Sequence, residues 1–135
     1  MSRPLITTLP APGTERAAAA ISAAAAITFA VLLGALHLIQ PGLDPSWRFI
    51  SEYALGRAGW LMNVAFVALA TSLLGAAVAL ARPVRTWPGR VGLVLLLIAA
   101  AGMLLAALFP TDPITVPVEA QTTAGRLHSL GASLD

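Results

Sequence analysis

Seven polar side chains could form a binding or reactive site in this chain of 135 residues, which is otherwise 58% apolar. Imidazole and carboxylate groups bind divalent metals and transfer protons, and arginine, serine and tyrosine side chains donate hydrogen bonds to ligands. These residue types are therefore compatible with a ligand pocket, a metal site or a catalytic site. The candidate ligand-pocket residues are His37, Arg48, Ser51, Glu52, Tyr53, Asp112 and His128.

The spacing of these residues gives little local support for a bound cofactor. Metal ligands could come from His37, Glu52, Asp112 and His128, but no His-x-x-x-His or Glu-x-x-His pair is present, so separate segments would have to converge. Haem held between the two histidines, or a triad of Ser51, a histidine and Asp112, needs the same convergence. The absence of cysteine excludes thiolate sites and disulfides. We predict no cofactor and retain a divalent metal or haem as alternatives.

Three long runs without formal charge define the elements that must position these side chains. Residues 17–43, 58–81 and 91–111 hold no Asp, Glu, Lys or Arg, and a mostly apolar run of ~18 residues or more predicts a membrane span. Only 10% of the residues are charged, against about 25% in a soluble domain. A water-soluble globule is therefore excluded, and we predict an all-α membrane protein built as a transmembrane bundle. The predicted elements are spans over about 17–39, 60–81 and 91–109, a short interfacial helix over about 45–55, and a partial fourth helix from about 125, within a membrane domain of residues 17–135.

The loop between the first two spans carries four of the candidate residues. Asp44 and Pro45 favour a helix start, because an aspartate can cap a helix and proline suits its first position. On such a helix Arg48 and Glu52 stand four residues apart and can form an ion pair. We expect the helix to lie along the membrane surface or to dip between the spans, with its apolar face turned inward. That face would comprise Phe49, Ile50, Tyr53 and Ala54.

The distribution of arginine predicts the orientation in the membrane. Five of the eight arginines lie in residues 1–16 and 82–90, which fall on the same side of the bilayer, and an arginine excess marks the cytoplasmic side. We therefore predict a multi-pass protein of the cell membrane with a cytoplasmic N-terminal tail, residues 1–16, and with the candidate residues facing outward. The lipid bilayer is the expected partner. Nucleic acid is not, because the net charge is only +2 and the arginines are scattered over short loops.

Small residues recur every four positions on two of the predicted spans. Ala68, Ser72 and Ala76 form one row, and Gly102 and Ala106 form another. Such rows let helix backbones approach closely in lipid. They predict close helix packing, either within the chain or in a homo-oligomer or with partner membrane helices.

Short motifs in a fixed order also resemble a known family. They are His37, Pro41, Ile50-Ser51-Glu52-Tyr53-Ala54-Leu55-Gly56, Gly59-Trp60-Leu61-Met62, Phe109-Pro110-Thr111-Asp112-Pro113 and the group Thr123, Gly125, Leu127, His128 and Gly131. This pattern resembles the bacterial integral-membrane family called domain of unknown function 998. The resemblance covers about residues 17–135 and implies a six-span architecture, of which this chain would carry three spans and the start of a fourth. It implies no activity. The family's signature residues map onto His37, Ser51, Glu52, Tyr53, Asp112 and His128.

Three functional interpretations follow, and we favour the first. The chain is a non-enzymatic polytopic protein whose outward-facing polar pocket binds a small molecule, a lipid headgroup or a partner helix. Alternatively, it is a membrane-embedded metal-dependent hydrolase or redox enzyme, or a structural or assembly subunit. Convergence of both histidines with Glu52 or Asp112 would favour an enzyme. Pairing of Glu52 with Arg48 or Arg57, with Asp112 confined to capping a turn, would disfavour it.

Overall fold

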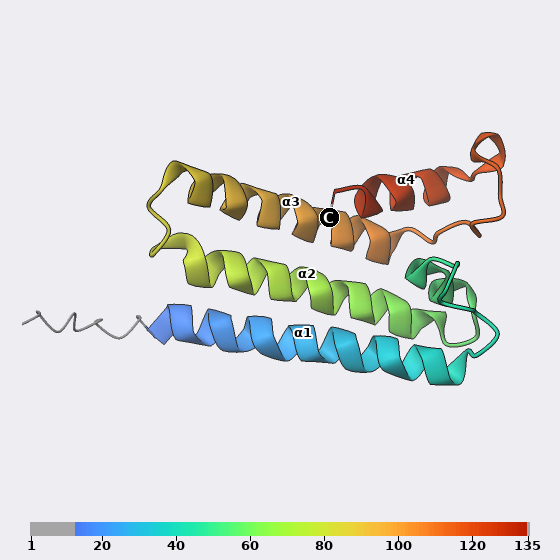
Figure 1. Cartoon of the computed structure of the whole chain (residues 1–135), viewed down its shortest axis with the longest axis horizontal. Helices are drawn as coiled ribbons and strands as arrows, with labels where there is room; N and C mark the ends of the chain where they lie inside the picture. The colour runs from blue at the N-terminus through green and yellow to red at the C-terminus, as the bar shows by residue number, and fades with distance from the viewer. Residues whose placement is uncertain (1–12, 135) are drawn as a thin grey trace, which may run out of the picture.

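The computed structural model describes residues 13–134, and within this range the chain is helical without a β-strand. Three long helices run up and down side by side, and a short fourth helix lies against the third (Figure 1). Residues 1–12, most of the predicted cytoplasmic tail, and Asp135 lie outside the described range. The elements are α1 (Gly13–Ile39), η1 (Ile50–Leu55), α2 (Gly59–Ala81), α3 (Trp87–Leu108), η2 (Val118–Ala120) and α4 (Thr123–Ala132).

The prediction of an all-α membrane protein is confirmed. Helices α1, α2 and α3 are each long and apolar enough to cross a membrane. Most of their apolar side chains are exposed in the isolated chain, and only 6% of the most apolar stretch of α1 is buried. An apolar surface of this extent is stable in contact with lipid rather than water.

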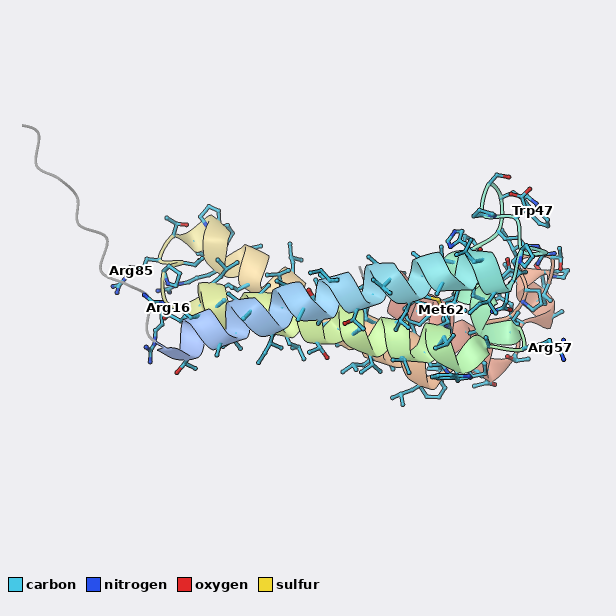
Figure 2. The ribbon with its side chains drawn as sticks, turned by 90° about the horizontal axis from the view of Figure 1, so that it is seen from below. Arg16, Trp47, Arg57, Met62 and Arg85 are labelled. Atoms are coloured by element: carbon cyan, nitrogen blue, oxygen red, sulfur yellow. The ribbon has the colours of Figure 1, made fainter. Side chains whose placement is uncertain are left out.

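Arginine residues lie at both ends of the bundle. Arg16 and Arg85 lie at one end, whereas Arg57 and Trp47 lie at the other (Figure 2). The second end carries η1, η2 and the loops on either side of them, and it is called the η1 end below. Met62 is fully buried between the helices near this end, and it belongs to the main core cluster together with Leu36, Tyr53, Phe66 and Met103.

The short helix of the first loop differs from the prediction. It is a 3₁₀ helix that begins at Ile50 instead of about 45, because Phe49 is extended (φ −70°, ψ 141°) and interrupts the turn formed by residues 44–48. The predicted apolar face is wrong for Phe49 and Ile50, which are exposed, and right for Tyr53 and Ala54, which belong to the core or pack against it. Ser51 and Glu52 are buried next to Tyr53. With three residues per turn, a 3₁₀ helix does not place positions i and i+4 on one face.

Glycines and small side chains allow the helices to approach closely. The Ser22 hydroxyl of α1 donates a 2.8 Å hydrogen bond to the Ser72 carbonyl of α2. A Cβ on Gly131 of α4 would lie 2.6 Å from the Gly102 carbonyl oxygen of α3. Both predicted rows of small residues therefore contribute to packing within the chain. Helix α4, with 10 residues, is about 15 Å long and accompanies only the η1-end half of α3 (Figure 1).

Candidate functional site

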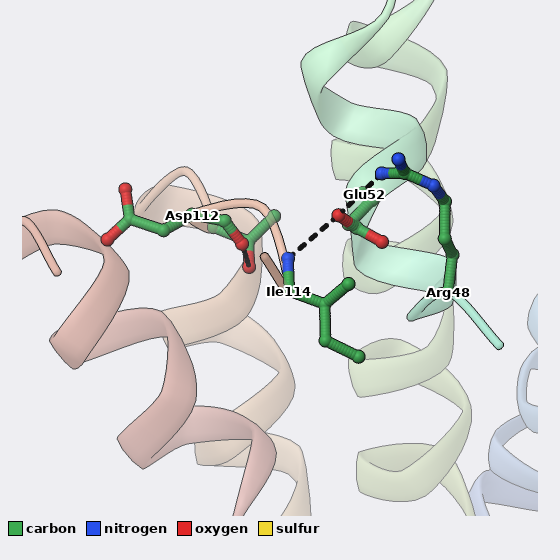
Figure 3. A network of polar contacts seen from close by, with 5 residues as sticks. Arg48, Glu52, Asp112 and Ile114 are labelled. Carbon is green, nitrogen blue, oxygen red and sulfur yellow. Dashed lines mark hydrogen bonds and ion pairs between the residues drawn. The ribbon is translucent and has the colours of Figure 1, made fainter. Parts of the chain in front are cut away.

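A buried carboxylate joins two separate segments at the η1 end. Oε1 of Glu52 accepts a 3.0 Å hydrogen bond from Nη1 of Arg48 and a 2.9 Å bond from the backbone N–H of Ile114 (Figure 3). The Glu52 side chain is fully buried, whereas 26% of the Arg48 side chain is exposed. The second oxygen, Oε2, is buried and has no hydrogen-bond partner among the described residues. The predicted Arg48–Glu52 pair is confirmed, and it anchors η1 to the segment that follows α3.

Asp112 anchors the start of α4. Its carboxylate accepts a 2.7 Å hydrogen bond from the Thr122 backbone N–H and bonds of 3.1 and 3.2 Å from the Thr122 hydroxyl. The same hydroxyl accepts from the N–H of Gly125 and so caps the helix. Gly125 lies directly against the carboxylate, and a Cβ at this position would collide with Oδ2 of Asp112. A negative charge at this position also stabilises the positive end of the helix dipole.

His128 completes the end of α3. Pro110 has no N–H, so the Ala106 carbonyl lacks its usual intrahelical donor. Nδ1 of His128 lies 3.1 Å from that oxygen and 2.9 Å from the Phe109 carbonyl oxygen. We assign the proton to Nδ1 because carbonyl oxygens only accept hydrogen bonds. Nε2 then carries a lone pair.

The Nε2 lone pair of His128 has no donor among the described residues. The side chain is almost completely buried, and its ring meets the Phe66 ring edge-on at 5.8 Å between centroids. A buried acceptor without a donor costs roughly 1–3 kcal/mol. The imidazole therefore stabilises the end of α3 through one nitrogen and leaves an acceptor unused at the other.

His37 and Tyr53 form a second group, between α1 and η1. Nδ1 of His37 lies 2.7 Å from the Leu33 carbonyl oxygen, and the two rings are 5.0 Å apart between centroids. The Tyr53 hydroxyl donates a 3.3 Å bond to the Leu43 carbonyl. Burial raises the pKa of the Tyr53 phenol, and the negative charge of Asp44 raises it further. The phenol therefore stays a neutral donor that holds the first loop.

A cavity of about 490 Å³ lies between α2, α3, α4 and the two loops of the η1 end. Three predicted residues line it: Ser51, Asp112 and His128. Sequence reasoning missed four further polar residues of its wall, Thr111, Gln121, Ser129 and Ser133. For two of them there was a signal, the four-residue spacing of Ser129 on α4 and Ser133 at its C-terminal cap, next to His128. His37, Arg48, Glu52 and Tyr53 are not part of the wall and hold the loops behind it.

The candidate residues do not form a metal cage or a triad. Within residues 13–134, no group of three or more His, Asp or Glu side chains is placed to hold a metal ion. Glu52 pairs with Arg48, and Asp112 binds Thr122. Nδ1 of His128 binds carbonyl oxygens, so it does not make the histidine–carboxylate bond that orients a triad. What the arrangement offers is a cavity with an apolar wall and a few hydrogen-bonding groups.

Comparison with known proteins gives a family match and no closer relative. A family model described as "Protein of unknown function (DUF998)" matches residues 22–134. This range contains both loops of the η1 end and all seven candidate residues. No curated protein and no solved structure matches the chain.

Proposed function

The chain belongs to the DUF998 family and has three helices long and apolar enough to cross a membrane, and from that premise we propose that its η1 end faces outward from the cell membrane and binds a small amphiphilic molecule. The binding site is the cavity between α2, α3 and α4. The protein acts as a binding protein in the bilayer, without a metal or haem.

The shape and chemistry of the cavity carry this proposal. Its volume, about 490 Å³, lies within the range of roughly 300–1,000 Å³ that small-molecule sites occupy. Leu69 and Met103 line it from within the spans, whereas Asp112 and Gln121 line it from the loops at the η1 end. An amphiphile fits this gradient, because its tail contacts the apolar wall and its headgroup stays at the membrane edge.

The two arginine-poor loops support the outward orientation. The end of the bundle that carries Arg16 and Arg85 (Figure 2) also carries the loop of residues 82–86. Because arginine-rich short loops stay in the cytoplasm, the η1 end faces the opposite side. The chain has no cysteine, so single cysteines at Ser2 and Thr115 provide a clean test with a membrane-impermeant maleimide. Only Thr115→Cys is expected to react in intact cells, and labelling of both or of Ser2→Cys alone refutes the orientation.

A photoreactive amphiphile tests the binding site directly. The probe is a monoacylglycerol with a diazirine in its acyl chain, added to the purified chain in lipid nanodiscs. Crosslinks are expected on residues of the cavity wall. They are expected to be at least tenfold weaker in Ser129→Trp, because Ser129 lines the cavity and an indole at this position would occupy part of its volume. Leu130→Trp is the matched control, because Leu130 is the next residue of α4, is exposed and does not line the cavity. Crosslinks spread evenly over lipid-facing residues and unchanged by Ser129→Trp contradict the proposal.

A further inference from the structure

Building on the proposed binding function, we infer that the cavity selects ligands whose headgroup donates hydrogen bonds, a hydroxyl or an ammonium group, and that it rejects anionic headgroups. The selecting groups are the lone pair on Nε2 of His128 and the carboxylate of Asp112. Both residues line the cavity.

The charge of the wall is the first observation. Among the described residues that line the cavity, Asp112 is the only one with a formal charge, and no arginine is among them. The nearby Arg48 is occupied by Glu52 and stacks on the Trp47 ring, 4.5 Å from its centroid. An anionic headgroup would therefore face a carboxylate without a compensating cation, which is unfavourable at the low dielectric of a membrane protein.

The unused hydrogen-bonding capacity is the second observation. Of the described residues, two have buried side-chain atoms without a partner at the η1 end, Oε2 of Glu52 and Nε2 of His128, and both atoms are acceptors. Asp112 adds a third acceptor, because Oδ1 accepts only one bond from Thr122, while a carboxylate oxygen accommodates about two. Of these acceptors, those of His128 and Asp112 belong to residues that line the cavity. A donor headgroup can satisfy these two, whereas a phosphate or sulfonate leaves them unpaired.

The position of Phe66 indicates how a donor reaches the imidazole. Nε2 of His128 is closed off from solvent. Phe66 packs edge-on against the imidazole and lines the same cavity. A movement of the Phe66 ring away from the imidazole would open a place beside His128 for the ligand headgroup.

Four probes with one acyl chain and one diazirine position test the selectivity. Their headgroups are glycerol, ammonium, sulfonate and a methyl ester without a donor. In the unmodified chain, the glycerol or the ammonium probe is expected to crosslink to the cavity wall at least tenfold more than the sulfonate probe. The donor probe that crosslinks to the cavity wall more than the methyl ester probe identifies the preferred headgroup. Equal labelling by the sulfonate probe and both donor probes overturns the inference. Failure of every probe to label the cavity would instead refute the binding function itself.

His128→Asn separates ligand binding from folding. The asparagine amide can replace Nδ1–H as the donor to the α3 carbonyls, and it lacks an acceptor at the position of Nε2. The variant is expected to reduce the preference for the donor probes over the methyl ester about fivefold to tenfold, the size of one hydrogen bond. Asp112→Asn is expected to reduce the preference for ammonium over sulfonate. A preference that neither substitution changes overturns the assignment of these groups, and the wild-type comparison remains decisive if either variant fails to fold.

Discussion

The ion pair at the η1 end predicts that removing Arg48 destabilises the chain more than neutralising its partner. Arg48→Met leaves the Glu52 carboxylate fully buried with one remaining donor, the N–H of Ile114. Glu52→Gln removes the charge but keeps a carbonyl oxygen that can accept from Ile114. The two variants therefore separate the cost of an unpaired buried charge from the cost of a weakened hydrogen bond.

The magnitudes follow from burial. Breaking a buried ion pair from one side costs about 3–5 kcal/mol. Arg48 is 26% exposed and partly hydrated, so we expect about 2–4 kcal/mol for Arg48→Met. Glu52→Gln exchanges charge-assisted hydrogen bonds for neutral ones and is expected to cost about 1–2 kcal/mol. The double variant no longer buries a charge, so its cost should fall below the sum by about 1–2 kcal/mol.

The assay is equilibrium unfolding in mixed detergent–lipid micelles, followed by the fluorescence of Trp47, which stacks against Arg48. A Trp60→Phe, Trp87→Phe background isolates this signal and serves as the reference for every variant. Arg57→Met is the matched control, because Arg57 is an exposed arginine of the same loop and makes no ion pair with the described residues. Its effect should stay within about 0.5 kcal/mol. The reasoning is refuted if Arg48→Met costs no more than Arg57→Met, or if the double variant is additive.

Two further predictions concern helix packing and pH. Gly131→Ala places a methyl group 2.6 Å from a backbone oxygen of α3 and should cost about 1–3 kcal/mol in the same unfolding assay. The control Gly92→Ala meets nothing within 4 Å and should stabilise the chain by about 0.5–1 kcal/mol. Equal effects of the two substitutions would contradict the close approach of α3 and α4. Hydrogen bonds from Ser46 hold the pKa of Asp44 below its ordinary value of 3.8, so the carboxylate stabilises the folded loop above that pH and loses this effect as the pH falls through the lowered pKa. An NMR titration of the Asp44 carboxyl should give a midpoint below 3.8, and a midpoint above it would exclude these bonds.

The sequence was sufficient to predict the three spans, because each coincides with a run free of charge that only lipid can surround. The Arg48–Glu52 pair was also predictable, since both residues lie within one turn of the same loop. The burial of Glu52 was not predictable from the sequence. Its burial depends on a 3₁₀ helix where an α-helix was expected, and on the N–H of Ile114, which lies 62 residues further along the chain.

The predicted site was divided for a similar reason. All seven candidates were assigned to one side of the membrane, but their side chains point to different neighbours. His37 and Tyr53 pack between α1 and η1, whereas His128 packs against α2 and α3. A span assignment gives the depth of a residue and not its direction around the helix axis, so it cannot separate two groups at the same level.

The end of α3 shows how a stabilising contact can also define a binding group. Pro110 ends the helix and leaves the Ala106 carbonyl without its usual donor. The imidazole of His128 supplies that donor, and the bond fixes which of its nitrogens keeps a lone pair. An alanine at position 128 would therefore lose stability and the acceptor together, and its phenotype could not distinguish the two roles. A substitution that keeps the donor and removes the acceptor, such as His128→Asn, is needed to separate a binding defect from a folding defect.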